Sequence, residues 1–213
     1  QPYFQFNNIS LSNTKILVVR GIPWKDCDIN VEHACEEAIK KISHAGIKVI
    51  EKEVSEIEEI HKILSDHGTT VAYEGYLQWK HLIEKNKDLM DINVLNRMLQ
   101  GKLMKIDSIM IVKEAQKQLS EKLYSTLSNY DCILMPTIPI LPPKIKDVAN
   151  NESLYDKYNM LALRNTRIGN VLPMCSISLP CPGSLPIGLM LSMPIGKDNK
   201  LINLAETIFN IIR

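Results

Sequence analysis

The stretch KILVVRGIPWKDCDINVEHACEEAIKKISHAGIKVIE, residues 15–51, decides the fold. Its first six residues, 15–20, form an apolar run rich in β-branched residues, which is typical of a buried strand. Residues 30–45 repeat apolar side chains at three- and four-residue steps, which predicts an amphipathic helix that stops before Gly46. Residues 47–50 return to a strand pattern. A strand, a helix and a strand in close succession predict two strands that are parallel or share one covered sheet, so the chain falls in the α/β class.

Helical patterns dominate the middle of the chain. Ser55 with Glu58 three residues later has the form of a capping box, and apolar residues follow it at helical spacing. Further helices are predicted over residues 70–83, 92–100 and 107–128. We therefore expect an N-terminal extension over residues 1–14 and an α/β region over 15–213, with a helical insert at about 55–128.

Strand patterns return after Asp131. A short apolar strand is predicted first, and the proline-rich segment that follows, residues 136–143, is expected to be non-helical because four of its residues are proline. The remaining predicted elements are a helix over 154–164, strands over 174–179 and 187–193, and a final helix over 199–212. Together these elements predict a mixed β-sheet covered by helices.

Composition excludes several classes of protein. The 213 residues include 25 basic and 24 acidic side chains, so a net charge of +1 provides no field that would attract nucleic acid or an anionic membrane. No apolar run approaches the roughly 18 residues of a membrane-spanning helix. The start QPYFQFNNIS, residues 1–10, does not have the pattern of a signal peptide, and the five cysteines form no CxxC pair. We expect a cytoplasmic protein with reduced thiols.

Motifs for a self-sufficient catalyst are absent from the sequence. The five histidines do not converge, and HExxH, GxSxG, GxGxxG and the P-loop pattern do not occur. We therefore expect neither a metal ion nor a cofactor. Cys132 and Cys175 lie in apolar strands and have no nearby histidine, so the pattern disfavours an independent cysteine or metal hydrolase.

Four segments in the second half carry a family resemblance. They read DCILMPTIPILPP over 131–143, RNTRIGNVLPMCSISLP over 164–180, LPIGLMLSM over 185–193 and KLINLAETI over 200–208. In this order they resemble the C-terminal half of amidase-signature hydrolases. Residues 15–51 resemble the strand–helix–strand that opens that half, and the stretch from Glu74 to Lys113 resembles its helical insert. The resemblance therefore extends from about Thr14 over nearly the whole chain.

One departure from the family pattern decides the functional expectation. Such enzymes cleave amides with a lysine, a bridging serine and a nucleophilic serine, and the serines lie in a glycine- and serine-rich tract. This sequence has no such tract, because its only Gly-Ser dipeptide, Gly183-Ser184, lies in a predicted turn. No catalytic residue can therefore be carried over, and without an activated nucleophile the covalent step of acyl transfer is not possible.

The resemblance does imply three substrate-binding candidates. Thr137, Asn165 and Thr166 are expected to line the acyl pocket or to brace the loop that carries the serines. From the residues alone, Asn165 and Thr166 are equally well explained as helix-end hydrogen bonders and Thr137 as a turn residue. Tyr76 and Trp79 are candidates for an outer substrate channel, although helix packing explains them better.

Two functional hypotheses remain. In the first, the chain is the C-terminal portion of an amidase that hydrolyses C–N amide bonds. The Ser-Ser-Lys half is then a partner supplied in cis or in trans, and a small amide is bound only in the complete enzyme. In the second, the chain is a non-catalytic amidase-like remnant that binds another chain or self-associates, since a divided sheet exposes strand edges. Neither hypothesis involves nucleic acid or a membrane.

Overall fold

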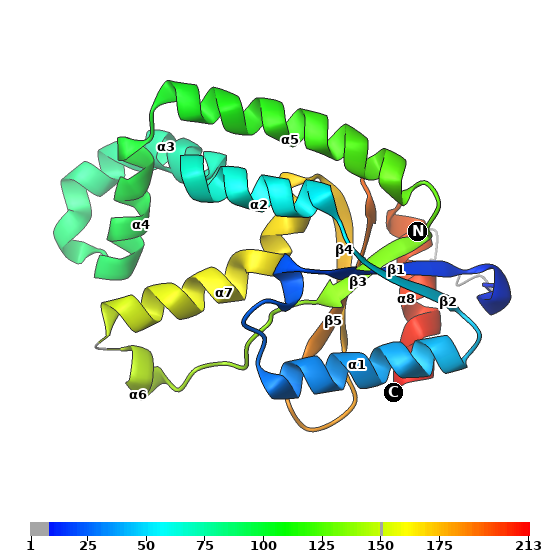
Figure 1. Cartoon of the computed structure of the whole chain (residues 1–213). Coiled ribbons are helices and arrows are strands. Elements are labelled where there is room, and N and C mark those ends of the chain that lie inside the picture. Colours follow the sequence, from blue (N-terminus) through cyan, green and yellow to red (C-terminus); the bar gives the residue numbers. More distant parts are fainter. Residues whose placement is uncertain (1–8, 150) are drawn as a thin grey trace, which may run out of the picture. The chain divides into compact units, whose positions relative to one another are not determined.

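Two compact units make up the chain. The computed structural model describes residues 9–149 and 151–213 (Figure 1). The described parts of residues 1–55 and 122–213 form an α/β unit, and Glu56–Glu121 form a helical unit. Most of the extension predicted at residues 1–14 lies outside the described residues, and in its described part Leu11–Asn13 form the short 3-10 helix η1.

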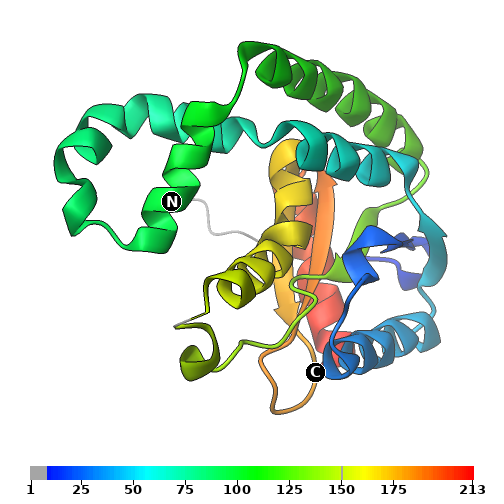
Figure 2. The ribbon, with the colours of Figure 1, turned by 60° about the vertical axis from the view of Figure 1, so that its left-hand side comes forward.

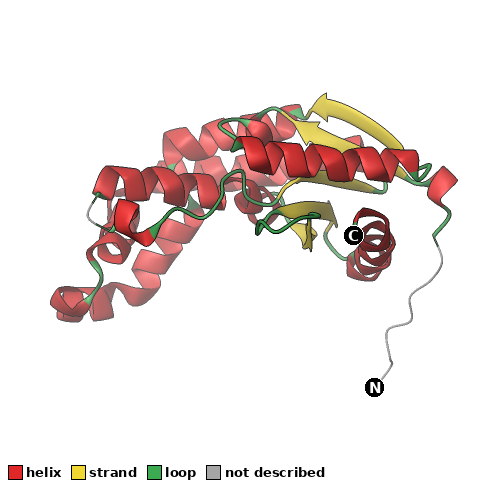
Figure 3. Cartoon of the chain, turned by 90° about the horizontal axis from the view of Figure 1, so that it is seen from below, coloured by secondary structure: helices red, strands yellow, loops and turns green. Residues whose placement is uncertain are grey.

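The α/β unit is built on one mixed sheet with the strand order β2-β1-β3-β5-β4. The strands are β1 (Lys15–Arg20), β2 (Lys48–Glu53), β3 (Cys132–Pro136), β4 (Met174–Pro180) and β5 (Gly188–Pro194). β1 pairs in parallel with both β2 and β3, as the strand–helix–strand pattern predicted for β1 and β2. β5 is antiparallel to β3 and β4. Figure 3 shows the strands in yellow, with the last helix beside them.

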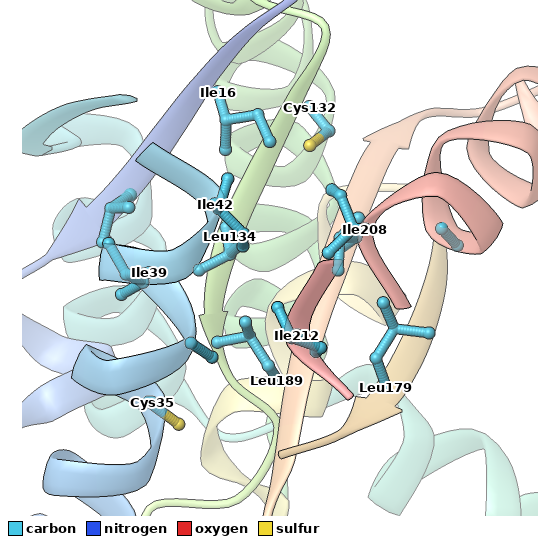
Figure 4. Packing of buried hydrophobic residues seen from close by; sticks show 14 of the residues in the cluster. Ile16, Cys35, Ile39, Ile42, Cys132, Leu134, Leu179, Leu189, Ile208 and Ile212 are labelled. Atoms are coloured by element: carbon cyan, nitrogen blue, oxygen red, sulfur yellow. The ribbon is translucent and has the colours of Figure 1, made fainter. Parts of the chain in front are cut away.

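Helices α1 (Ile29–His44) and α8 (Asp198–Ile212) cover one face of this sheet. Side chains from alternate positions of the central strands meet the apolar faces of both helices in one core. Figure 4 shows Leu134 and Leu189 from the sheet beside Ile42 of α1 and Ile208 of α8. The strong apolar periodicity of both helices made them predictable from sequence, because it places every third or fourth residue in this core.

Helix α7 (Glu152–Val171) packs on the opposite face (Figure 2). A Cβ placed on Gly169 would lie 3.0 Å from Ser176 Oγ, so α7 approaches β4 closely on the face turned away from the core of α1 and α8. Ser176 and Ser192 share a hydrogen bond of 2.8 Å between their hydroxyls across β4 and β5. On β4 and β5 this face therefore carries serine hydroxyls, whereas Leu17, Ile133 and Met135 make it apolar on the central strands.

The helical unit consists of α2 (Ser55–His67), α3 (Thr70–Asn86), α4 (Ile92–Leu103) and the first part of α5 (Ile106–Leu127). Asp91 caps α4 by accepting hydrogen bonds from the N–H groups of Asn93 and Val94. The remaining short elements of the chain are η2 (Ile22–Trp24), η3 (Lys87–Leu89) and α6 (Ile145–Val148). The predicted fold class, a mixed sheet covered by helices, is confirmed.

The sequence-based boundaries differ most in α7. The apolar pattern predicts a helix over 154–164 that ends at RNTRIGN, whereas the helix continues through that segment to Val171. Its buried residues include Arg164 and Asn165, whose polar side chains interrupt the apolar periodicity. Their hydrogen bonds to distant loops compensate their burial, and such long-range partners are invisible in the local sequence.

Candidate functional site

An apolar cavity of about 500 Å³ lies between the proline-rich segment and α7 in the α/β unit. The proline-rich segment contributes aliphatic side chains from residues 138 and 140–143, and α6 adds Val148. One face of α7 contributes residues spaced three or four apart, which are Tyr155, Tyr158, Asn159 and Ala162. Thr137, Ser178 of β4, and Pro186 with Gly188 at the start of β5 complete the lining.

A hydroxyl pair provides much of the polar character of this cavity. Thr137 Oγ1 and Ser178 Oγ lie 2.6 Å apart, and the backbone N–H of Thr137 donates to the carbonyl of Gly188 at 2.8 Å. A Cβ on Gly188 would overlap Ser178 Oγ and come within 2.8 Å of Thr137 Oγ1. Glycine at position 188 therefore leaves the space that the two hydroxyls occupy.

Asn165 fixes the loops that follow two neighbouring strands. Its side chain is fully buried, and Nδ2 donates to the carbonyls of Pro23 (3.0 Å) and Pro136 (2.8 Å). Pro23 lies just beyond β1, and Pro136 is the last residue of β3, immediately before Thr137. Asn165 therefore holds the start of the proline-rich segment from behind the cavity, and it is not among the residues that line it.

Arg164 also holds the loop that follows β1 against α7. Its guanidinium donates to the carbonyl of Lys25 at 2.6 Å and to that of Pro23 at 3.3 Å, and Nε donates to Asn165 Oδ1 at 3.3 Å. Hydrogen bonds from a buried charged donor are stronger than neutral ones. In the sequence, Arg164 stands out only as the first residue of the segment RNTRIGN, residues 164–170. No local pattern indicates that its side chain turns into the fold.

The three predicted binding residues thus occupy different places. Thr137 lines the cavity, Asn165 supports its wall, and Thr166 donates its hydroxyl to the carbonyl of Leu163 in its own helix at 3.3 Å. Thr166 is not among the lining residues, and it lies within α7 rather than at a helix end, because the helix continues to Val171. Their roles toward a substrate stay predictions.

Sequence reasoning missed the tyrosine-bearing face of α7. Tyr155, Tyr158 and Ala162 have the spacing of a single helical face, which is a signal that could have grouped them. That spacing does not show which neighbour the face meets. This face lies across the cavity from the proline-rich segment, which precedes α7 in the sequence and continues directly from the end of β3.

A second cavity of about 340 Å³ shares Tyr158 and residues 140–143 with the first. Its other lining residues include Asp26, Asp28 and Lys157. The proline-rich segment therefore contributes to two cavities of different character. The first has no ionisable acid or base besides its tyrosines among the described residues that line it, whereas the second contains both carboxylates and an ammonium group.

The cysteines form a buried contact in the core. The sulfur atoms of Cys35 and Cys181 are 3.9 Å apart. The hydrogen bond between them, together with burial, raises the pKa of Cys35, and the same hydrogen bond lowers the pKa of Cys181 against the effect of burial. Burial raises the pKa of Cys27 to about 11, with a further contribution from the charge of Glu32. The described residues that line the two cavities include no cysteine–histidine pair.

Other candidate groups do not assemble a catalytic site within the described residues. His67 Nδ1 lies 3.4 Å from Ser108 Oγ in the helical unit, but neither residue lines either cavity. Tyr76 is buried in the same unit and its hydroxyl donates to Glu84 at 3.4 Å, whereas Trp79 is half-exposed.

In residues 9–149 and 151–213, no group of three or more His, Cys, Asp or Glu side chains is placed to hold a metal ion. No helix in the same residues combines the length and the apolar character that crossing a bilayer requires.

Known proteins resemble this chain in sequence and in fold. It is 26% identical over 202 residues to 2-amino-5-chloromuconic acid deaminase of Comamonas testosteroni, an alignment that covers 90% of this chain and 43% of the relative. It is 25% identical to one of the subunits of the glutamyl-tRNA(Gln) amidotransferase from Saccharolobus solfataricus, covering 96% of this chain and 47% of the relative. The chain thus spans less than half the length of these relatives.

The fold of this chain is also similar to that of a solved structure. The allophanate hydrolase of Kluyveromyces lactis superimposes with a TM-score of 0.81 at 18% identity, over 93% of this chain and 32% of that one. The family model described as Amidase matches residues 1–202, which confirms the resemblance inferred from the four ordered segments. This 213-residue chain is a member of the Amidase family.

Proposed function

We propose that this chain is the C-terminal portion of a hydrolase that cleaves C–N amide bonds, and that its catalytic lysine and serines are supplied by a segment outside these 213 residues. The family match over residues 1–202 carries the proposal. Two further observations support it. The chain spans less than half of its relatives, and its sequence contains no glycine- and serine-rich tract.

The proposed division of labour follows from the site. Acyl transfer needs a nucleophile activated by a neighbouring base, and the apolar cavity provides none among its described lining residues. The cavity instead offers apolar surface for part of a substrate and hydroxyls that can orient it. We assign Thr137 to substrate contact and Asn165 to positioning of the proline-rich segment. Thr166 is assigned a supporting role along α7.

The partner is the half that carries Ser-Ser-Lys, either within one longer polypeptide or as a separate chain. One relative is named as part of a multi-subunit amidotransferase, which supports assembly with another polypeptide. The edges of the sheet, β2 and β4, each have a single neighbouring strand among the described residues, so each is a surface where further strands can pair. All five cysteines are free thiols, which suits the cytoplasmic setting that we propose.

The test is a hydrolysis assay with and without the other half. The 213-residue chain is purified alone and also co-expressed with the polypeptide that contains the serine and lysine residues, and ammonia release from small amides is measured. We expect turnover only when both are present. A matched preparation, in which the nucleophilic serine of the other half is replaced by alanine, should assemble and remain inactive. Turnover by the 213-residue chain alone would overturn the proposal.

The second candidate is a non-catalytic, self-associating protein. The edge of β4 favours it, because the outer side of that strand has no neighbour among the described strands. Sedimentation velocity over a range of concentrations separates the two functions. A concentration-dependent dimer that persists beside the co-expressed half, with no turnover, would favour the second candidate over the first.

A further inference from the structure

We infer that Cys35 and Cys181 are a site of oxidative modification, at which a peroxide converts two thiols into a reversible disulfide bond within the native α/β unit. The bond joins α1 to the end of β4, and neither residue lines either cavity. The inference does not depend on the proposed function, because both residues lie in a core that this chain builds from its own sheet, α1 and α8.

The two sulfur atoms are already in contact. Cys35 Sγ and Cys181 Sγ lie 3.9 Å apart, and the two residues are 0% and 6% exposed. A disulfide bond holds its sulfur atoms about 2 Å apart, so the two atoms must approach each other by about 2 Å. Changes in the χ1 angles of the two side chains move the sulfur atoms by distances of this order. Each thiol is therefore within reach of the other.

The periodicity of two distant elements produces this contact. Cys35 belongs to the buried face of α1, together with Val31 and Ile39. Cys181 directly follows β4 and continues the alternation that turns Leu179 toward the same core. Figure 4 shows Cys35 on α1 and Leu179 on β4 in this core. The cysteines are 146 positions apart in the sequence, so tertiary packing and not a local turn brings them together.

The hydrogen bond that the two thiols share gives them different roles. It lowers the pKa of Cys181 against the effect of burial, whereas the same hydrogen bond and burial raise the pKa of Cys35. The thiolate is the form of cysteine that reacts with an oxidant. Cys181 is therefore the nucleophile that attacks the peroxide, and Cys35 is the thiol that completes the bond.

The reaction removes two electrons and two protons from the pair. The Cys181 thiolate attacks one oxygen of hydrogen peroxide, the O–O bond breaks, and a sulfenic acid and hydroxide are formed. The hydroxide takes up the proton that Cys181 released. Cys35 then attacks the sulfenic sulfur, the S–S bond forms as the S–O bond breaks, and the leaving hydroxide takes the proton of Cys35. Two thiols and one hydrogen peroxide thus yield one disulfide and two water molecules.

The turn after Cys181 provides access for a small oxidant. Residues 183–186 are exposed, and the N–H of Cys181 donates to the carbonyl of Ile187 at 2.9 Å, which closes the turn. An exposed turn opens locally at a lower free energy than a packed core. Hydrogen peroxide is small and uncharged, so a brief opening of this turn is enough for it to reach the Cys181 sulfur.

The other three cysteines are less suited to this reaction. Cys132 is buried in β3, and burial raises the pKa of its thiol. Cys175 Sγ lies 3.5 Å from two backbone carbonyl oxygens at the end of β5. Cys27 is the competitor nearest to Cys35, because its charge contributes to the raised pKa of Cys35. Its own pKa is raised to about 11, however, so Cys27 remains protonated at neutral pH. The native fold therefore favours the bond between Cys35 and Cys181.

Peroxide oxidation of the 213-residue chain tests the inference. The reduced protein is treated with hydrogen peroxide under native conditions and, in parallel, in urea. Catalase then removes the peroxide, and the remaining thiols are alkylated after denaturation. Mass spectrometry of non-reduced peptides identifies the bond, and a glutamyl endopeptidase is included because Glu32 lies between Cys27 and Cys35. We expect the native protein to form only the bond between Cys35 and Cys181, which dithiothreitol reverses, whereas the protein in urea gives a mixture of pairings.

Two matched variants and a thermal measurement locate the bond in the fold. Cys181→Ala should abolish it, whereas Cys175→Ala, which removes the cysteine within β4, should leave it in place. Circular dichroism confirms that both variants are folded. Oxidation should raise the Tm of the unmodified chain by at least about 5 °C, because the bond joins residues 146 positions apart in the unfolded chain. It should not change the Tm of Cys181→Ala.

Three results would overturn the inference. The first is a native protein whose five thiols all remain available for alkylation after peroxide treatment. The second is a bond that joins any other pair of cysteines. The third is a lower Tm after oxidation, because the bond would then be incompatible with the native fold. Peptide mapping of the unmodified chain decides the first two even if a variant does not fold. None of these results bears on the hydrolysis assay, so the proposed function stands or falls separately.

Discussion

At the scale of the residue, Asn165 and Arg164 show how a buried polar group can shape a site that it does not touch. Asn165 donates hydrogen bonds to the carbonyls of Pro23, just after β1, and Pro136, at the end of β3. Arg164 holds the loop after β1 as well, through the carbonyl of Lys25. The position of Thr137 in the cavity follows from these contacts, since it is bonded directly to the residue that Asn165 fixes. Two side chains that do not line the cavity therefore set the position of its wall.

Replacing Asn165 by alanine should destabilise the α/β unit. The substitution removes both Nδ2 hydrogen bonds and leaves the Pro136 carbonyl without this donor, so we expect the free energy of unfolding to fall by about 2–3 kcal/mol. Urea denaturation followed by circular dichroism measures the loss. Thr166→Ala is the matched control, because it removes only a helix-internal bond and should cost less than about 1 kcal/mol. Equal losses in the two variants would contradict the role assigned to Asn165.

Cys27 should react slowly with alkylating reagents at neutral pH. Burial, with the charge of Glu32, raises its pKa to about 11, so at pH 8 only about one thiol in a thousand is ionised. The rate of iodoacetamide modification, followed by mass spectrometry of the Cys27 peptide, should rise about tenfold per pH unit up to pH 10. A short peptide with the same local sequence serves as control and should level off near pH 9. A plateau of the folded protein at that same pH would refute the expectation.

At the scale of the element, periodicity predicted what packs in one continuous apolar face. The sheet strands, α1 and α8 could be read from sequence because their buried residues recur at fixed intervals and meet a single core. The end of α7 could not, since its buried face includes Arg164 and Asn165. The cavity was only partly predictable for a related reason. Thr137 was identified through the family resemblance, whereas the tyrosines of α7 acquire their place from tertiary packing.

Two glycines in the helical unit should respond to alanine with opposite signs. A Cβ on Gly101 of α4 would overlap the carbonyl oxygen of Ala72 in α3, so Gly101→Ala should force the helices apart and cost about 1–3 kcal/mol. A Cβ on Gly75 of α3 would meet only Met98 Sδ at an ordinary 3.8 Å. Gly75→Ala should therefore stabilise the helix by about 0.5–1 kcal/mol. Chemical denaturation monitored at the helical unit distinguishes them, and a shift of both variants in the same direction would disprove the close approach.

At the scale of the whole molecule, α3 and α4 of the helical unit bury fewer residues than the central strands of the α/β unit. β1, β3 and β5 each have neighbours on both sides and are largely buried. In the helical unit, α3 buries Tyr76 and Ile83, and α4 buries only Gly101 among its described residues. Few buried contacts and many exposed helical hydrogen bonds are the physical signs of low local stability.

Hydrogen exchange should resolve this difference. We expect amides of β1, β3 and β5 to exchange only through global unfolding, and amides of α3 and α4 to exchange at least a hundredfold faster. Mass spectrometry of peptides from a timed exchange series at neutral pH provides the measurement. Gly101→Ala should accelerate exchange in α3 and α4 and leave the central strands unchanged. Uniform protection across both units would mean that the chain unfolds as one cooperative body.

The sheet order has a kinetic consequence. β1 meets β2 after a short crossover, but its other neighbour, β3, starts at Cys132, whose partner in the ladder is Ile16. A nascent chain therefore holds β1 with one flank unpaired until Cys132 and the residues after it have left the ribosome. Long-range pairing of this kind is slow because the intervening chain must first be drawn into a loop. During that delay the unpaired flank of β1 exposes its backbone N–H and C=O groups to pairing with other chains.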